Sequence, residues 1–128
     1  YKGPGYTLPA HFLPTLYHKR GMIGSPRKPD TKNERLRSDG SQFYIVTGRK
    51  YHDKELDEIE KQNKYKFSAE QREFYKTIGG SPHLDGSYTI FGEVTSGMEI
   101  ADEIVKAETD NEWRPLNDIR LKRVRILK

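Results

Sequence analysis

The chain contains no cysteine, so disulfide bonds are excluded and the redox compartment stays open. No apolar run approaches the about 20 residues of a membrane span, and no segment has the pattern of a signal peptide. The histidines lack the spacing of zinc ligands, and no His-Glu-x-x-His motif occurs. We therefore expect neither a metal site nor a cofactor in a chain whose histidines are His11, His18, His52 and His83.

Apolar side chains are also scarce. Hydrophobic residues make up 33% of the 128 residues and charged residues another 33%, whereas a typical domain has about 25% charged residues. The length fits one domain. Because apolar residues are scarce in it, we expect either one segment that is exposed to solvent or a hydrophobic core that lies partly on sequence outside this chain. Because the chain opens with Tyr1 and not with Met, we expect a product of processing or truncation, with any signal lying in the missing start.

Positive charge exceeds negative charge by four. Basic clusters of this kind can bind nucleic acid, but no RNA-binding or zinc-finger motif accompanies them. The favoured interpretation is that basic side chains such as Arg120 and Lys122 line the outer face of a strand, where they discourage edge-to-edge pairing. We therefore do not expect a nucleic-acid partner.

The first half of the chain predicts short strands joined by loops. Residues 1–20 are irregular, 21–24 form a short strand, and 25–40 form a polar loop that closes on a turn. A stronger strand follows at 42–47, where alternation places Gln42, Tyr44 and Val46 on one face. The other face carries Phe43, Ile45 and Thr47.

Residues 51–76 differ in kind, because they are highly charged and helical in pattern. Asp53 is expected to cap a first helix that carries Leu56 and Ile59. Ser68 and Gln71 have the spacing of a capping box and open a second helix, with an apolar stripe of Phe74 and Ile78. The stripe is narrow, so we predict a helical insertion packed loosely against the rest of the domain, with a partner-binding arm as the alternative.

The second half predicts a strand at 88–94, with Tyr88 and Ile90 on one face. A second capping box, Ser96 to Glu99, is expected to open a helix that runs to about residue 106. Trp113 is placed in a loop, and alternation predicts a last strand at 118–128 with a one-residue bulge. This order favours a mostly antiparallel β-structure with helical caps.

Two motifs carry the strongest signal: Gly40-Ser41-Gln42-Phe43-Tyr44-Ile45-Val46-Thr47, and His83-Leu84-Asp85-Gly86 followed by Ser87 to Gly92. Together with Gly3-Pro4-Gly5-Tyr6 and His18-Lys19-Arg20-Gly21, they resemble the cyclophilins, the peptidyl-prolyl cis-trans isomerases, and their bacterial members in particular. The resemblance covers residues 1–128 outside the insertion at about 51–76. It implies an antiparallel cyclophilin-like barrel with helical caps, here incomplete because the first strands and first helix are absent.

The resemblance also implies a surface that binds proline-containing peptides or unfolded segments. Tyr44, where the family usually has Phe, and Leu84 would form the floor of an apolar pocket for the proline ring. Gln42 would bind the peptide backbone, and Tyr88 would hydrogen-bond a carbonyl. The loop at Pro26 and Arg27 would border the peptide. His83 replaces a Trp found in the members most sensitive to cyclosporin, so we expect weak binding of that drug.

The family's catalytic arginine belongs to a motif of the form F-H-R-V, upstream of Gly3-Pro4-Gly5-Tyr6. None of the arginines in this chain has those neighbours, so no catalytic residue is assigned. We expect a prolyl isomerase that assists protein folding, with little activity in this chain alone. The alternatives are a binding module that recognises proline segments without isomerising them and, more weakly, an RNA-binding surface. Tyr44 and Leu84 would otherwise be ordinary core residues, and the compartment, bacterial cytoplasm or periplasm, is undetermined.

Overall fold

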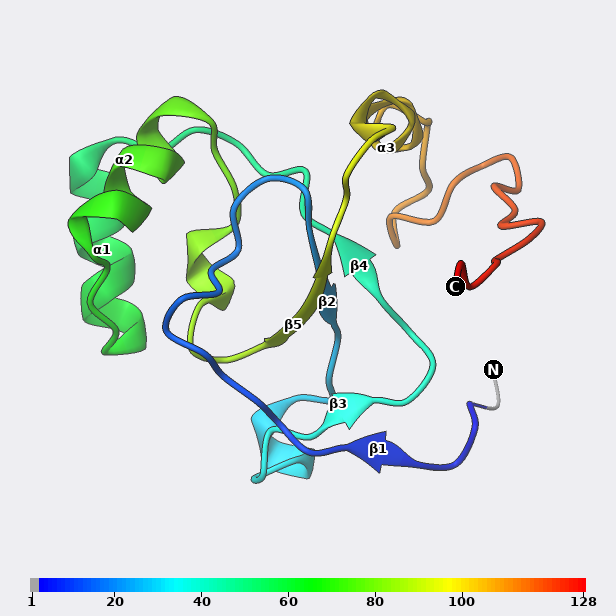
Figure 1. Cartoon of the computed structure of the whole chain (residues 1–128), viewed down its shortest axis with the longest axis horizontal. Helices are drawn as coiled ribbons and strands as arrows, with labels where there is room; N and C mark the ends of the chain where they lie inside the picture. The colour runs from blue at the N-terminus through cyan, green and yellow to red at the C-terminus, as the bar shows by residue number, and fades with distance from the viewer. Residues whose placement is uncertain (1–2) are drawn as a thin grey trace. The chain divides into compact units, whose positions relative to one another are not determined.

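The computed structural model describes residues 3–128, which divide into one compact unit that ends at Ser96 and a second unit from Gly97 to Lys128. The first unit contains two antiparallel sheets (Figure 1). Strand β1 (Thr7–Leu8) pairs with β3 (Ser38–Asp39), and β2 (Met22–Ser25) lies between β4 (Tyr44–Ile45) and β5 (Thr89–Glu93). The predicted antiparallel class is confirmed, but among residues 3–128 these sheets do not close into a barrel.

Strand β2 is central because both of its edges are paired. Ile23 lies opposite Ile45 on β4 and opposite Gly92 on β5, and a β-bulge shifts the β5 register between Ile23 and Gly24. The predicted strand at 42–47 is shorter than expected, although the Val46 backbone N–H still donates to the Met22 carbonyl at 2.9 Å. The predicted alternation on β5 is confirmed, since Ile90 is buried and Phe91 is 62% exposed.

Two helices follow β4 in the chain and lie side by side (Figure 1): α1 (Asp53–Asn63) and α2 (Ala69–Thr77). The prediction of Asp53 as the cap is wrong by one residue. The cap is His52, whose backbone N–H donates to Glu55 at 2.8 Å. The predicted capping box of α2 is confirmed, because Ser68 accepts a hydrogen bond from the Gln71 backbone N–H and donates its own to the Gln71 side chain.

A single arginine links the two helices. The Arg72 guanidinium on α2 contacts Asp53 at 3.0 Å, Asp57 at 2.9 Å and Glu60 at 3.3 Å, all on α1. These carboxylates are partly or largely exposed, so each pair contributes little alone. Their shared geometry nevertheless explains why so highly charged a segment forms an ordered helical pair.

The loose packing predicted for this helical segment is wrong. Leu56 and Tyr75 are completely buried and form the larger core cluster with Tyr17 and Phe67. Tyr75 meets the rings of Tyr17 and Phe67 edge to face, at centroid distances of 5.8 and 5.7 Å. The predicted stripe missed Tyr75, and the predicted Ile78 is 50% exposed. A few large aromatic side chains bury enough area to build a core where aliphatic residues are scarce.

The second unit contains α3 (Met98–Val105) and an irregular remainder. The helix is confirmed, but its predicted capping box is wrong: Gly97 is the cap, with a left-handed φ of 92°, and makes no side-chain hydrogen bond. The predicted strand at 118–128 is also wrong. Within residues 97–128 the only backbone bridge joins Thr109 and Pro115, so the alternating segment has no neighbouring strand in this unit to supply ladder hydrogen bonds.

No helix among residues 3–128 combines the length and the apolar character needed to cross a membrane.

Candidate functional site

Tyr44 is the central side chain of the candidate site. It lies on β4, is partly buried, and packs against the cluster of Met22, Val46 and Ile90. Its ring also covers Gly24 on the neighbouring strand β2. The absence of a side chain at residue 24 therefore gives the Tyr44 ring its place over the sheet.

Replacing Gly24 by alanine is expected to displace this ring. An added Cβ would overlap the Tyr44 ring atoms, and overpacking of this kind costs about 1–3 kcal/mol of unfolding free energy. Gly92→Ala is the matched control on β5, because its Cβ would meet Ile23 at an ordinary 3.5 Å. Urea unfolding of both variants checks this. Equal stability of the two variants would contradict the position given to the ring.

Tyr44, Tyr88 and Arg27 form a contiguous group. The rings of Tyr44 and Tyr88 meet edge to face at 6.3 Å, and the Arg27 guanidinium lies 4.6 Å from the centre of the Tyr88 ring. Arg27 also donates to the Ser87 carbonyl at 2.8 Å and pairs with Asp30. These contacts orient the guanidinium and hold one face of Tyr88. Three of the predicted site residues are thus brought together.

Pro26, Arg27 and Gln42 line a cavity of about 520 Å³ beside β1 and β3, together with Gly3, Pro4, Gly5, Tyr6, Thr7, Lys28 and Asp39. The Gln42 side-chain amide donates to Asp39 at 3.2 Å, and the Gln42 backbone N–H donates to the same carboxylate at 2.9 Å. Hydrogen bonds from the backbone, led by the Ser41 N–H, lower the pKa of Asp39. The ionised carboxylate therefore fixes Gln42 at the rim of the cavity.

His83 and Leu84 lie on the short 3₁₀ helix η2 (Pro82–Leu84). The Leu84 carbonyl accepts the Tyr88 backbone N–H at 3.2 Å, which ties this turn to the start of β5. The His83 carbonyl accepts from Asn63 at 2.9 Å, and partial desolvation of its ring lowers the pKa of His83. Neither residue lines the cavity around Gln42. A pocket shared by Tyr44 and Leu84 stays a prediction.

Tyr88 lines a second hollow, of about 110 Å³. Its walls are largely apolar or aromatic, and its lining residues are His11, Phe12, Leu13, Pro14, Leu16, Tyr65, Gly86, Tyr88 and Ile90. Tyr88 therefore borders this hollow while Arg27 borders the larger cavity.

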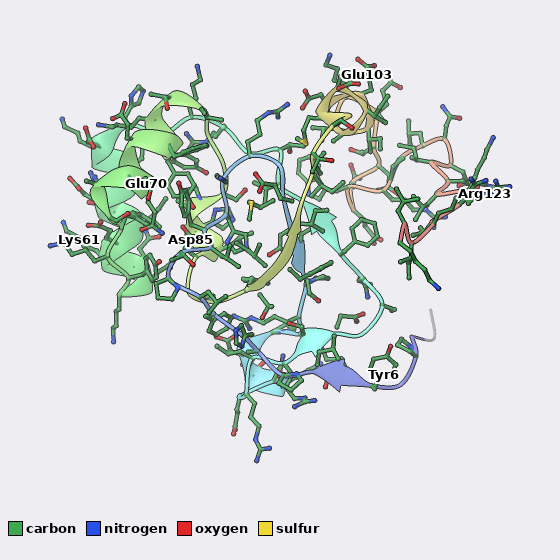
Figure 2. The ribbon with its side chains drawn as sticks, viewed as in Figure 1. Tyr6, Lys61, Glu70, Asp85, Glu103 and Arg123 are labelled. Carbon is green, nitrogen blue, oxygen red and sulfur yellow. The ribbon has the colours of Figure 1, made fainter. Side chains whose placement is uncertain are left out.

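The Tyr44 hydroxyl contacts a buried polar network that the sequence interpretation missed. Asp85, 3% exposed, accepts hydrogen bonds from the His18 backbone N–H at 2.7 Å, from His18 Nδ1 at 2.8 Å and from the Tyr75 hydroxyl. His18 Nε2 lies 2.7 Å from the Tyr44 hydroxyl. Figure 2 shows Asp85 beside the helical pair. Both His18 and Asp85 stand in the quoted motifs, but only the fold shows that they meet.

Burial raises the pKa values of the Tyr44 and Tyr75 phenols, and the Asp85 carboxylate adds to the effect for both. In the unfolded chain these tyrosines lose their protons near pH 10.0, whereas in the native state they keep them. The unfolded state therefore binds fewer protons above that pH, and the stability that is present below it is lost as pH rises.

We expect the unfolding free energy to decline as pH increases beyond about 10. Urea unfolding across that range measures the decline, and Tyr75→Phe should make it shallower because one shifted phenol is removed. Phenolate absorbance provides a second measurement, since Tyr44 and Tyr75 should titrate after the exposed tyrosines. A single titration step for all eight tyrosines would contradict this.

No group of three or more His, Cys, Asp or Glu side chains among residues 3–128 is arranged to hold a metal ion. The polar groups near Tyr44 are instead committed to one another. The site as built offers the aromatic faces of Tyr44 and Tyr88, the Arg27 guanidinium and the fixed amide of Gln42.

Residues 2–126 match the family described as "Cyclophilin type peptidyl-prolyl cis-trans isomerase/CLD". Human "Peptidyl-prolyl cis-trans isomerase-like 3" is 44% identical over 55 residues, which cover 42% of this chain and 34% of the relative. "Peptidyl-prolyl cis-trans isomerase CYP18-1" of Arabidopsis thaliana is 48% identical over 54 residues, covering 42% and 34%, and "Peptidyl-prolyl cis-trans isomerase-like 1" of Emericella nidulans is 40% identical over 55 residues, covering 43% and 34%. The chain thus matches about a third of the length of these curated relatives. All three are eukaryotic, so the bacterial likeness stays a prediction.

Proposed function

Because this chain belongs to the cyclophilin-type peptidyl-prolyl cis-trans isomerase family, we propose that it binds X-Pro segments of unfolded proteins and assists their folding. The peptide lies across Tyr44 and Tyr88, bordered by Pro26 and Arg27. The observation that carries the proposal is the contiguous group of Arg27, Tyr88 and Tyr44 within a domain of this family.

The chemistry of prolyl isomerisation suits such a surface. Rotation about an X-Pro bond crosses a barrier of about 18–20 kcal/mol and needs neither a nucleophile nor a general base. An apolar slot favours the twisted, less polar amide, and Tyr44 with Leu84 would form its floor. Gln42 would hold the peptide backbone, and Tyr88 would donate to a carbonyl. Binding of this kind accelerates the reaction only where it is stronger in the transition state.

A donor aimed at the prolyl nitrogen would supply that selectivity. We do not assign this role to Arg27, because its Nε atom donates to the Ser87 carbonyl and its Nη1 atom pairs with Asp30. We propose that these 128 residues alone bind X-Pro peptides with little isomerisation, since no arginine among them has the family's F-H-R-V neighbours. The alternative of a non-catalytic proline-binding module makes the same prediction for this chain, but not for this chain extended by a segment that contains the motif.

Calorimetric titration with an X-Pro peptide tests the binding. Tyr44→Ala should weaken binding at least about tenfold, as expected for loss of a central aromatic anchor. Phe43→Ala is the matched control, because Phe43 is the adjacent aromatic residue and is 49% exposed. Equal losses for the two variants, or no preference for the X-Pro peptide over an X-Ala peptide, would contradict the proposal.

A protease-coupled assay tests the catalytic part. This chain extended by a segment that contains the family's F-H-R-V motif should accelerate cis-trans exchange, whereas the 128 residues alone should not. Equal rates of cis-trans exchange for the two proteins would contradict the proposal that the arginine of the F-H-R-V motif supplies the donor. Weak binding of cyclosporin, implied through His83, stays a prediction.

A further inference from the structure

A continuous series of hydrogen bonds runs from helix α2 to the candidate site. It begins at the Tyr75 hydroxyl, which donates to one Asp85 oxygen. The other Asp85 oxygen accepts from His18 Nδ1 at 2.8 Å, and His18 Nε2 lies 2.7 Å from the Tyr44 hydroxyl. Because Nδ1 of a neutral imidazole donates to the carboxylate, Nε2 is left as the acceptor for the Tyr44 O–H.

The middle of this series is shielded from water. The side chains of His18 and Asp85 are each 1% exposed, and Tyr75 is completely buried. Hydrogen bonds in such surroundings are strong and directional, because water does not compete for the same groups. The His18 ring also stacks on the Tyr44 ring at a centroid distance of 5.9 Å, with an interplanar angle of 22°.

Tyr44 is therefore held at its hydroxyl end by a partner that is itself fixed. Its ring otherwise rests on Gly24 and meets Tyr88 at the edge. Loss of the hydrogen bond that the Tyr44 hydroxyl donates to His18 would leave the ring with packing contacts but without a fixed tilt. The orientation of the Tyr44 ring thus depends on residues that lie far from it in the sequence.

We propose that Tyr75, Asp85 and His18 are positioning residues for Tyr44, so that helix α2, through Tyr75, influences the affinity of the site for X-Pro peptides. This inference rests on the proposed function. It gives the charged helical segment a role beyond filling the core: Tyr75 places a hydroxyl where it orients Asp85, and Asp85 selects the imidazole tautomer that accepts from Tyr44.

A double-mutant cycle of Tyr75→Phe and Tyr44→Phe tests the inference, with peptide affinity as the readout. Each single variant should weaken binding by about fivefold, the factor for loss of one hydrogen bond. The double variant should bind the peptide no more weakly than Tyr44→Phe alone, because Tyr44→Phe already removes the last hydrogen bond of the series. A merely structural role of Tyr75 would lower affinity equally in both backgrounds, and that result would overturn the inference.

Tyr51→Phe is the matched control, because Tyr51 packs against the same aromatic cluster and takes no part in the series. Its affinity should stay within about twofold of the unaltered chain, since surface or partly buried hydroxyls outside the network contribute little. In protein labelled with ¹³C at tyrosine Cζ, Tyr75→Phe should shift the Tyr44 resonance, and Tyr51→Phe should not. An unmoved Tyr44 resonance in Tyr75→Phe would also overturn the inference.

The two failures are distinguishable. If the unaltered chain binds no X-Pro peptide, the proposed function is wrong and this inference falls with it. If the unaltered chain binds but the two variants are additive, the positioning role alone is wrong.

Discussion

Leu56→Ala is expected to lower the unfolding free energy by about 2–5 kcal/mol, because the variant leaves a cavity in a fully buried site. Leu56 stands on α1 and is 0% exposed within the cluster of Tyr17, Phe67 and Tyr75. The surrounding rings are large and edge-packed, so they have few ways to close the space. Urea unfolding followed by circular dichroism measures the loss.

The matched control is Leu121→Ala, at a leucine that is 70% exposed. That change should stay within about 0.5 kcal/mol of the unaltered chain. The comparison decides between two views of the helical segment. If Leu56→Ala were as harmless as Leu121→Ala, the helices would be a loosely packed excursion, as the charge pattern alone suggested.

Asp85→Ala is expected to cost about 3–5 kcal/mol, through a different mechanism. The carboxylate accepts from the His18 backbone N–H, from His18 Nδ1 and from the Tyr75 hydroxyl, and its side chain is 1% exposed. Removing it leaves three buried donors without their acceptor. Because each unsatisfied buried donor costs free energy, the loss should exceed that of an ordinary surface aspartate.

Asp118→Ala provides that comparison, since Asp118 pairs with Arg120 on the surface, with side chains 62% and 77% exposed. It should change stability by less than about 1 kcal/mol. The stability of Asp85→Asn should fall between those of Asp85→Ala and Asp118→Ala, because asparagine keeps one acceptor oxygen. Equal stability of Asp85→Ala and Asp118→Ala would show that water replaces the carboxylate and that the network is not buried.

Local patterns predicted several elements correctly. The alternation of Ile90 and Phe91 identified β5, and the Ser68–Gln71 spacing identified the start of α2. These features depend on residues close in sequence, so their chemistry is visible there. Tyr44 and Tyr88 meet, with Arg27 against the second ring, and their role in binding a peptide stays a prediction.

Other predictions failed where a distant partner decides the outcome. The segment 118–128 alternates like a strand, yet a strand also needs a neighbouring backbone to receive its hydrogen bonds, and residues 97–128 supply none to it. The high content of charged residues predicted that the helical segment is exposed to solvent, because a residue count does not show which side chains are buried. In the fold, four buried side chains anchor this segment in the core: Tyr17, Leu56, Phe67 and Tyr75.

The sequence by itself determined the family, the strands β2 and β5 and the start of α2, because motifs, alternation and the Ser68–Gln71 capping box are local in the chain. Tertiary structure alone decided that Tyr75, Asp85 and His18 form a series of hydrogen bonds that ends at the Tyr44 hydroxyl. Asp85 is 67 residues from His18 along the chain, and no periodicity connects positions so far apart. Their hydrogen bonds exist only because folding removes all three from water at the same place.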